Sequence, residues 1–271
     1  MSSNQENFLA NQYRDATNLN ARGNLHARFR TNPRNWFLWV FDRFDLPQQC
    51  RILELGCGPA GLWLENLERI PMGWNIVLSD LSAGMVQAAK RNLNGSEKAF
   101  EFRVFDAQSI PYPDKAFDAV VANHMLYHVP DLKRCIIEIY RVLKSNGKFY
   151  AATNGKGHHK EINDLTAQWL PKLAVVAEKK MTANRFTLEN GEAKIKPPFH
   201  NIRADIYEDV LEVTQAEPLL AYILSTDSNN SSKIDPGEVD ALKDHLEKEL
   251  AEKGSIHITK STGMFVASKI L

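Results

Sequence analysis

The stretch that decides the fold is Arg51-Ile52-Leu53-Glu54-Leu55-Gly56-Cys57-Gly58-Pro59-Ala60-Gly61, an apolar run that ends in three closely spaced glycines. Such a run predicts a buried strand, a tight turn and the start of a helix. At a helix N-terminus the backbone N–H groups are available to a ligand, and glycine lets the ligand approach them closely. The stretch therefore predicts a ligand-binding loop at the end of a strand.

The alternation of strand and helix continues after this loop. Four more strands are predicted, over residues 75–79, 100–104, 117–122 and 148–153. Ser82 and Asp131 stand where each can cap a helix between two of these strands. Strands separated by helices in this rhythm build a parallel sheet with helices on both faces. After an interruption from Gly155 to Pro198, a strand is predicted at 202–207, a charged helix at 236–253, and a strand pair at 256–259 and 264–268.

Composition excludes several classes of protein. Of the 271 residues 44% are hydrophobic, which is enough for a full core, and 33 basic residues balance 33 acidic ones. This balance gives no global field that favours nucleic acid or an anionic membrane. The N-terminus lacks the build of a signal peptide, and no apolar run is long enough to span a bilayer. Cys50, Cys57 and Cys135 have no metal-ligand spacing, so we expect reduced thiols in a cytoplasmic protein without a metal site.

Three acidic residues stand at the ends of the first three strands of this pattern: Glu54, Asp80 and Asp106. The carboxyl ends of parallel strands meet at one edge of a sheet, where such folds bind ligands. Glu54 suits a ligand with an ammonium group, Asp80 suits ribose hydroxyls, and Asp106 suits an adenine amine. Gly56-x-Gly58-x-x-Gly61 alone would serve NAD equally well, but the acids favour a cationic cofactor without phosphate.

Four segments carry a family resemblance, in order along the chain. They are Ile52–Gly58, Asp80–Met85, Asp106–Tyr112 with Phe117–Val120, and Arg141–Lys148. Together they resemble the motifs of class I S-adenosylmethionine-dependent methyltransferases, small-molecule enzymes of the ubiquinone/menaquinone-methyltransferase type. The resemblance covers about residues 51–153, and Ser145-Asn146 stands where the family more often has Pro-Gly.

The resemblance implies a Rossmann-like α/β fold: a seven-stranded, mostly parallel sheet with helices on both faces and an antiparallel edge strand. It predicts four segments, which are a helical N-terminal cover (1–46), a cofactor-binding core (47–154), an insertion that lines the substrate pocket (155–198) and the strands and helices that complete the sheet (199–271).

The resemblance also assigns cofactor contacts. Gly56, Cys57 and Gly58 would lie against the amino-acid part of S-adenosylmethionine, together with Glu54. Asp80 would bind the ribose. Further contacts would come from Leu81 and Met85 near the adenosine, Asp106 and Ala107 at the adenine, and Asn123 near the methionine portion. Tyr13, Arg22 and His26 of the N-terminal cover could reach the cofactor carboxylate or the substrate, and the alternative is a solvated basic arm.

Two histidines, His124 and His128, follow the fourth strand near the expected methyl group, and either is a candidate base. The alternative is that one orients a loop and the other packs on the cofactor. His158 and His159 could border the substrate pocket, although neighbouring loop histidines are more often solvated. Tyr127 is expected to pack.

The expected activity is methyl transfer to a small-molecule acceptor. The alternatives are an RNA or protein methyltransferase, a catalytically silent S-adenosylmethionine-binding protein, and a nicotinamide enzyme. The neutral net charge counts against nucleic acid as a partner, and the acceptor atom stays open.

Overall fold

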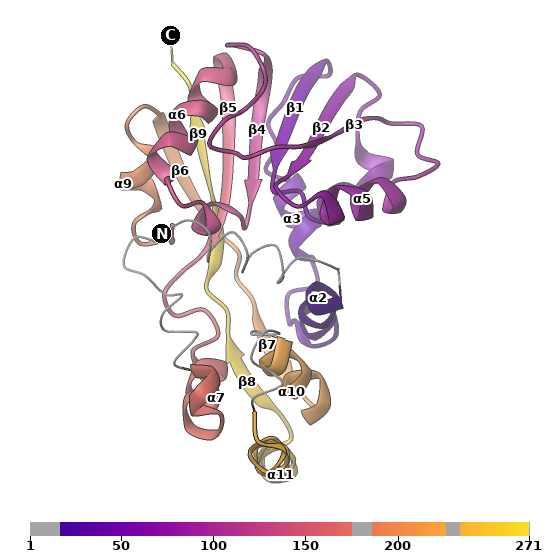
Figure 1. The fold of residues 1–271 in the computed structure, drawn as a ribbon, viewed down its shortest axis with the longest axis vertical. Coiled ribbons are helices and arrows are strands. Elements are labelled where there is room, and N and C mark those ends of the chain that lie inside the picture. The colour runs from indigo at the N-terminus through magenta and orange to yellow at the C-terminus, as the bar shows by residue number, and fades with distance from the viewer. Residues whose placement is uncertain (1–16, 175–185, 226–233, 271) are drawn as a thin grey trace. The chain divides into compact units, whose positions relative to one another are not determined.

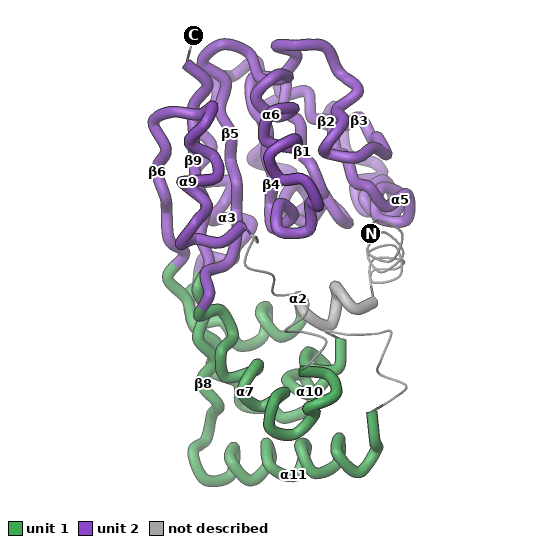
Figure 2. Tube along the Cα trace, turned by 60° about the vertical axis from the view of Figure 1, so that its left-hand side comes forward, with its two compact units in different colours: residues 1–33, 157–184, 208–261 green, residues 34–156, 185–207, 262–271 purple. Residues whose placement is uncertain are grey.

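The computed structural model describes residues 17–174, 186–225 and 234–270, with only the backbone described for 17–22. The chain forms two compact units, and each is assembled from three separate segments (Figure 2). Unit 1 comprises residues 1–33, 157–184 and 208–261. Unit 2 comprises residues 34–156, 185–207 and 262–271. This division differs from the four consecutive segments expected from the sequence, because the chain leaves unit 2 and returns to it twice.

Unit 2 is built on a seven-stranded sheet (Figure 1). Its strands are β1 (Cys50–Leu55), β2 (Trp74–Asp80), β3 (Ala99–Val104), β4 (Phe117–Asn123), β5 (Leu143–Asn154), β6 (His200–Ile206) and β9 (Thr262–Ser268). The strand order is β3-β2-β1-β4-β5-β9-β6. The pairs from β3 to β5 are parallel, whereas β9 is antiparallel to both β5 and β6. The predicted Rossmann-like, mostly parallel sheet is confirmed.

Two hydrophobic clusters cover the two faces of this sheet. One face packs against α3 (Trp36–Phe41), α4 (Gly61–Leu64) and α5 (Ala83–Asn92). The other face packs against α6 (Leu132–Val142) and α9 (Gly191–Ile195). Neighbouring residues of β2 divide between the clusters, with Val77 in one and Leu78 in the other, as the side-chain alternation of a strand requires. The short 3-10 turns η1 (Leu67–Arg69) and η2 (Leu126–His128) complete this unit.

Several local predictions hold. Ser82 caps α5 by accepting a hydrogen bond from the N–H of Met85, and Asp131 caps α6 through the N–H of Arg134. The three cysteines are free and buried.

Unit 1 is a helical unit around one small sheet. Its helices are α2 (Thr17–Phe29), α7 (Lys160–Trp169), α10 (Ala216–Ser225) and α11 (Pro236–Lys253), and its two antiparallel strands are β7 (Val210–Val213) and β8 (Ile256–Thr259). A third hydrophobic cluster, with Leu25, Leu219, Leu246 and Ile258 among its members, forms its core. None of the helices in the described part of the chain has the length and apolar composition needed to cross a bilayer.

Two predictions about the C-terminal strands are wrong. Residues 256–259 and 264–268 do not form a strand pair, because β8 pairs with β7 in unit 1 while β9 pairs with β5 and β6 in unit 2. The short polar connection between them resembles a hairpin turn but instead carries the chain from one unit to the other. The antiparallel strand is also not at the sheet edge, because β6 lies outside it.

The parallel core can be tested at Leu53, which is completely buried in β1. We expect Leu53→Ala to lower the free energy of unfolding of unit 2 by about 3 kcal/mol, through lost burial and the cavity left behind. Four of the five tryptophans (Trp36, Trp39, Trp63 and Trp74) lie in unit 2, so denaturation followed by tryptophan emission reports mainly on this unit.

The matched control is Met72→Ala, since this side chain is 73% exposed. It should change the same free energy by no more than about 0.5 kcal/mol. Equal effects of the two variants would contradict the placement of β1 in the centre of the sheet.

Candidate active site

The glycine loop after β1 has an unusual backbone. Gly56 and Gly58 adopt left-handed conformations with φ of 63° and 53°, and Ala60 has φ 66°. A Cβ atom on Gly56 would stand 2.6 Å from the Cβ of Met125, which follows β4. Gly56 is therefore required both by its conformation and by the close approach of the neighbouring strand end.

The carboxylate of Asp80 connects this loop to the next helix. One oxygen accepts a hydrogen bond from the N–H of Gly58 at 3.0 Å, and the other accepts one from the N–H of Ser82 at 2.8 Å. Burial raises the pKa of Asp80 above its usual value, and the backbone donors act in the opposite direction. Asp80 stands at the strand end as predicted, and it also holds the loop in place.

Glu54 lies in the interior with 2% of its surface exposed. Its carboxylate accepts a hydrogen bond from the indole N–H of Trp63 in α4 at 2.6 Å. Burial raises the pKa of Glu54 to about 8; the hydrogen bond from Trp63 opposes this and the Asp80 carboxylate adds to it. Glu54, which the sequence predicts as a partner for an ammonium group, is thus engaged by Trp63 in the structure. This hydrogen bond fixes α4 next to the glycine loop.

Asp106 follows β3 and is engaged by a residue that sequence reasoning missed. The side-chain amide of Gln108 donates to both Asp106 oxygens, at 3.0 and 2.8 Å, and the backbone N–H of Gln108 donates to one of them at 2.8 Å. The side-chain oxygen of Gln108 accepts from the N–H of Asp131, the cap of α6. Asp106 therefore belongs to a short network that joins two loops at this edge of the sheet.

The end of β4 carries the side chains expected near the transferred methyl group. The Asn123 side-chain oxygen accepts a hydrogen bond from the indole N–H of Trp36 at 3.1 Å. His124 has a left-handed backbone with φ 57°, and its ring centroid lies 4.9 Å from that of Trp36. His128 ends η2, and its ring packs edge-on against Tyr127 at 4.5 Å. Trp36 of α3, which no sequence motif indicated, thus contacts two predicted site residues.

The remaining predicted cofactor contacts differ in exposure. Leu81 is 56% exposed, whereas Met85, Ala107 and Cys57 are buried. Burial raises the pKa of the Cys57 thiol well above its ordinary value, and the carboxylates of Glu54 and Asp80 act in the same direction. Cys57 is therefore a packed thiol of the loop rather than a reactive one.

The predicted contacts of the N-terminal cover fall in unit 1 or outside the described residues. Tyr13 lies outside the described residues, and Arg22 lies in α2, where only the backbone is described. His26 stacks on His159 with 5.2 Å between ring centroids, and His158 stacks on His159 at 3.7 Å.

His159 is buried rather than solvated, and its Nδ1 lies 3.0 Å from the Tyr222 hydroxyl. Burial holds its pKa well below the ordinary value, and the nearby His158, His26 and Lys260 add to this. The described residues hold no group of three His, Cys, Asp or Glu side chains placed to share a metal ion.

The predicted residues of the core converge because the strands end level with one another. Leu55 of β1 pairs with Ser79 of β2 and with Ala122 of β4, so Gly56, Asp80 and Asn123 leave the sheet at the same edge. A model of the methyltransferase domain family matches residues 53–151, which contain this whole edge. Residues 53–151 therefore form a methyltransferase domain.

Relatives of this methyltransferase domain act on different molecules. A ubiquinone/menaquinone biosynthesis C-methyltransferase from Xanthomonas oryzae is 30% identical over 121 residues, which are 44% of this chain and 45% of the relative. A sterol 4-C-methyltransferase from Caenorhabditis elegans is 24% identical over 197 residues, 69% of this chain and 57% of the relative. The chain thus spans about half the length of these curated relatives.

Solved structures share the fold. A phosphoethanolamine N-methyltransferase from Haemonchus contortus superposes with a TM-score of 0.59 at 19% identity, over 97% of this chain and 59% of that one. The YcgJ protein of Bacillus subtilis gives a TM-score of 0.56 at 15% identity, over 86% and 97% of the two chains. At these identities the likeness concerns the fold.

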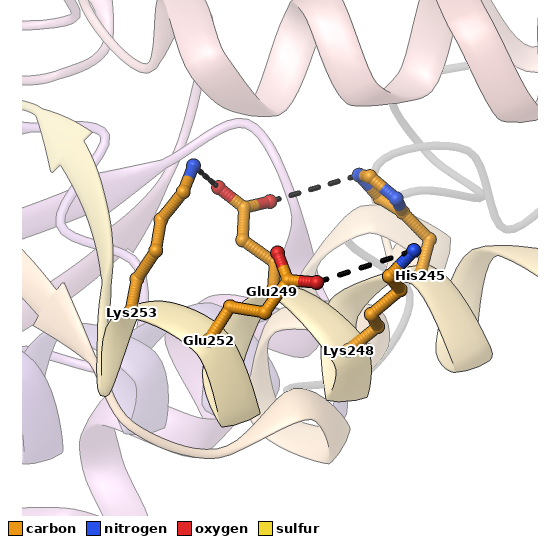
Figure 3. Close-up of a pocket in the computed structure, with 5 residues that line it drawn as sticks. All are labelled: His245, Lys248, Glu249, Glu252 and Lys253. Atoms are coloured by element: carbon orange, nitrogen blue, oxygen red, sulfur yellow. Dashed lines mark hydrogen bonds and ion pairs between the residues drawn. The ribbon is translucent and has the colours of Figure 1, made fainter.

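A hollow along α11 in unit 1 has a different character (Figure 3). Its lining consists of side chains on a single helix, which are His245, Lys248, Glu249, Glu252 and Lys253. Glu249 contacts Lys253 at 2.8 Å and His245 at 3.6 Å, and Lys248 contacts Glu252 at 4.0 Å. These are contacts between side chains four residues apart on a charged helix face, and they bring together no catalytic chemistry.

The state of Glu54 in the methyltransferase domain predicts a pH dependence of stability. Its pKa is about 8 in the folded chain against an ordinary value of 4.5, so the folded state retains a proton that the unfolded state has lost. As the pH rises from 6 to 8, this group should therefore lower the free energy of unfolding by about 2 kcal/mol.

Glu54→Gln keeps an oxygen that accepts from Trp63 but does not ionise, so we expect it to lose this decline. Tryptophan-monitored denaturation at pH 6, 7 and 8 measures the difference. The control is Glu68→Gln at an exposed position, which should follow the wild type. A Glu54→Gln variant that also follows the wild type would contradict the buried, uncharged state of Glu54.

Proposed function

We propose that the chain is an S-adenosylmethionine-dependent methyltransferase that transfers a methyl group to a small-molecule acceptor. The observation that carries the proposal is the single sheet edge at which the glycine loop, Asp80 and Asn123 meet within a methyltransferase domain. Open parallel sheets bind their ligands at this edge.

The charges at this edge fit the cofactor. The loop from Gly56 to Gly61 contains no cationic side chain. The carboxylate of Asp80 accepts a hydrogen bond from it, and the carboxyl group of Glu54, uncharged at neutral pH, lies next to it. A pyrophosphate would meet acids and no cation there. A ligand with a positive charge and hydroxyl donors instead meets groups that accept hydrogen bonds, which supports S-adenosylmethionine over a dinucleotide.

When bound, S-adenosylmethionine supplies an electrophilic methyl group on a positively charged sulfur. The chain contributes position, because displacement requires the acceptor atom to be held in line with the bond that breaks. Asn123 and His124 at the end of β4 are the polar side chains that we place beside the acceptor. Where the acceptor atom carries a proton, His124 or His128 is the group that takes it.

The small-molecule class is supported by the relatives, whose names specify a quinone pathway and a sterol. A formal net charge of zero argues against an RNA substrate, which a basic surface would bind. An RNA or protein methyltransferase and a silent cofactor-binding protein are the other outcomes of a substrate screen. We also place the protein in the cytoplasm, on the basis of its three buried thiols.

Calorimetry with two probes tests the choice of cofactor. We expect S-adenosylhomocysteine to bind to the full chain at micromolar concentration, and NADH to give no heat of binding under the same conditions. Tight binding of NADH together with no response to S-adenosylhomocysteine would overturn the proposal.

A glycine substitution tests the binding loop itself. We expect Gly56→Ala to weaken binding of S-adenosylhomocysteine by at least about tenfold, since the new Cβ collides with Met125 and forces the loop to move. The matched control is Gly95→Ala, because Gly95 also has a positive φ, 82°, but has open space around it. Both variants carry the same backbone strain, so equal affinities would show that the loop does not hold the cofactor.

A further inference from the structure

We infer that Thr262 fixes the tautomer of His124, so that Nε2 carries the proton and Nδ1 is the nitrogen that can accept one from the methyl acceptor. This inference rests on the proposed function for the role of His124, but its structural content does not depend on the cofactor. It assigns a positioning role to Thr262, a residue of β9 that is distant in sequence from every motif of the domain.

The backbone around His124 is fixed. His124 directly follows β4, and its N–H donates a hydrogen bond to the carbonyl of Ala152 in β5 at 3.2 Å. Its φ of 57° is uncommon for a residue other than glycine and costs free energy. Strain of this kind persists where the surrounding structure fixes a residue, often at functional sites.

Thr262 determines which nitrogen of His124 is protonated. Its hydroxyl oxygen lies 3.1 Å from the carbonyl oxygen of Thr153 and 3.5 Å from Nε2 of His124. A carbonyl oxygen can only accept, so the hydroxyl uses its one proton for Thr153. Towards His124 the hydroxyl oxygen can then only accept, and this bond requires a proton on Nε2. In a neutral imidazole the proton-accepting nitrogen is consequently Nδ1.

The surroundings of Thr262 keep this arrangement in place. Thr262 is 3% exposed and Thr153 is fully buried, so bulk water does not compete for their hydrogen bonds. The backbone carbonyl of Thr262 accepts from the N–H of Tyr207 at 3.0 Å, and Thr262 pairs with Asn154 of β5. The backbone that carries the hydroxyl is therefore held on both sides of β9.

Trp36 supports the same geometry from a third element. Its ring lies against His124 at 4.9 Å, and its indole N–H donates to Asn123, the residue before His124. An aromatic face next to an imidazole also stabilises the cation that forms when the imidazole takes up a proton. The tautomer set by Thr262 and the contact with Trp36 thus act on the same side chain.

Nitrogen NMR on the full chain, labelled with 15N-histidine, tests this assignment without any acceptor. Two-bond proton–nitrogen correlations distinguish the two tautomers, and His124→Asn identifies the His124 signals among the eight histidines. We expect neutral His124 in the wild type to have its proton on Nε2. Thr262→Val should shift the tautomer ratio by about fivefold towards Nδ1–H, as the loss of one hydrogen bond implies. Thr262→Ser should restore the wild-type ratio.

The matched control is Thr166→Val, which removes a buried hydroxyl in unit 1 and should leave the His124 signals unchanged. A proton on Nδ1 in the wild type, or an unchanged ratio in Thr262→Val, would overturn the inference. Binding of S-adenosylhomocysteine is measured on the same samples. Its absence from the wild type would refute the proposed function, whereas the tautomer result would stand or fall by itself.

Discussion

The carboxylate of Asp80 holds the glycine loop and the start of α5 together at the edge where the parallel strands end. It ends β2, and its two oxygens accept from the N–H of Gly58 in the glycine loop and of Ser82 at the start of α5. The loop contains three left-handed residues in a short stretch, so it needs such an anchor to keep one conformation. The ribose contact that we propose for Asp80 is compatible with this structural role, because carboxylate oxygens accept several hydrogen bonds.

Features that depend on local chemistry could be predicted from the sequence. The helix caps at Ser82 and Asp131, the strands from β1 to β5 and the edge at which they end follow from periodicity and from short-range hydrogen bonding. The pairing partners of the C-terminal strands β8 and β9 could not be predicted in this way. Whether β9 pairs with β8 or with β5 depends on which side chains become buried against elements far away in the sequence. The two polar residues between β8 and β9 are compatible both with a hairpin turn and with a connection from one unit to the other.

At the site, too, the sequence predicted the residues but not their hydrogen-bond partners. The sequence placed Glu54, Asp106 and Asn123 at the right strand ends, but it did not show that each has a specific hydrogen-bond donor. Trp63 is nine residues from Glu54, and Trp36 is 87 residues from Asn123. Such pairings arise only when helices pack on the sheet.

Two residues other than glycine, Ala60 and His124, adopt left-handed conformations at the edge where β1 and β4 end. Ala60 follows β1 together with the left-handed Gly56 and Gly58, and His124 follows β4, whereas the left-handed Lys115, Asn146 and Asn201 lie elsewhere in unit 2. Ala60 and His124 gain no conformational freedom of the glycine kind, and their strain must be offset by the contacts that hold them. For His124 these contacts include β5 through Ala152, β9 through Thr262 and α3 through Trp36. A residue whose backbone and side chain are together held by three elements is preorganised, and preorganisation is what in-line methyl transfer demands of the groups beside the acceptor.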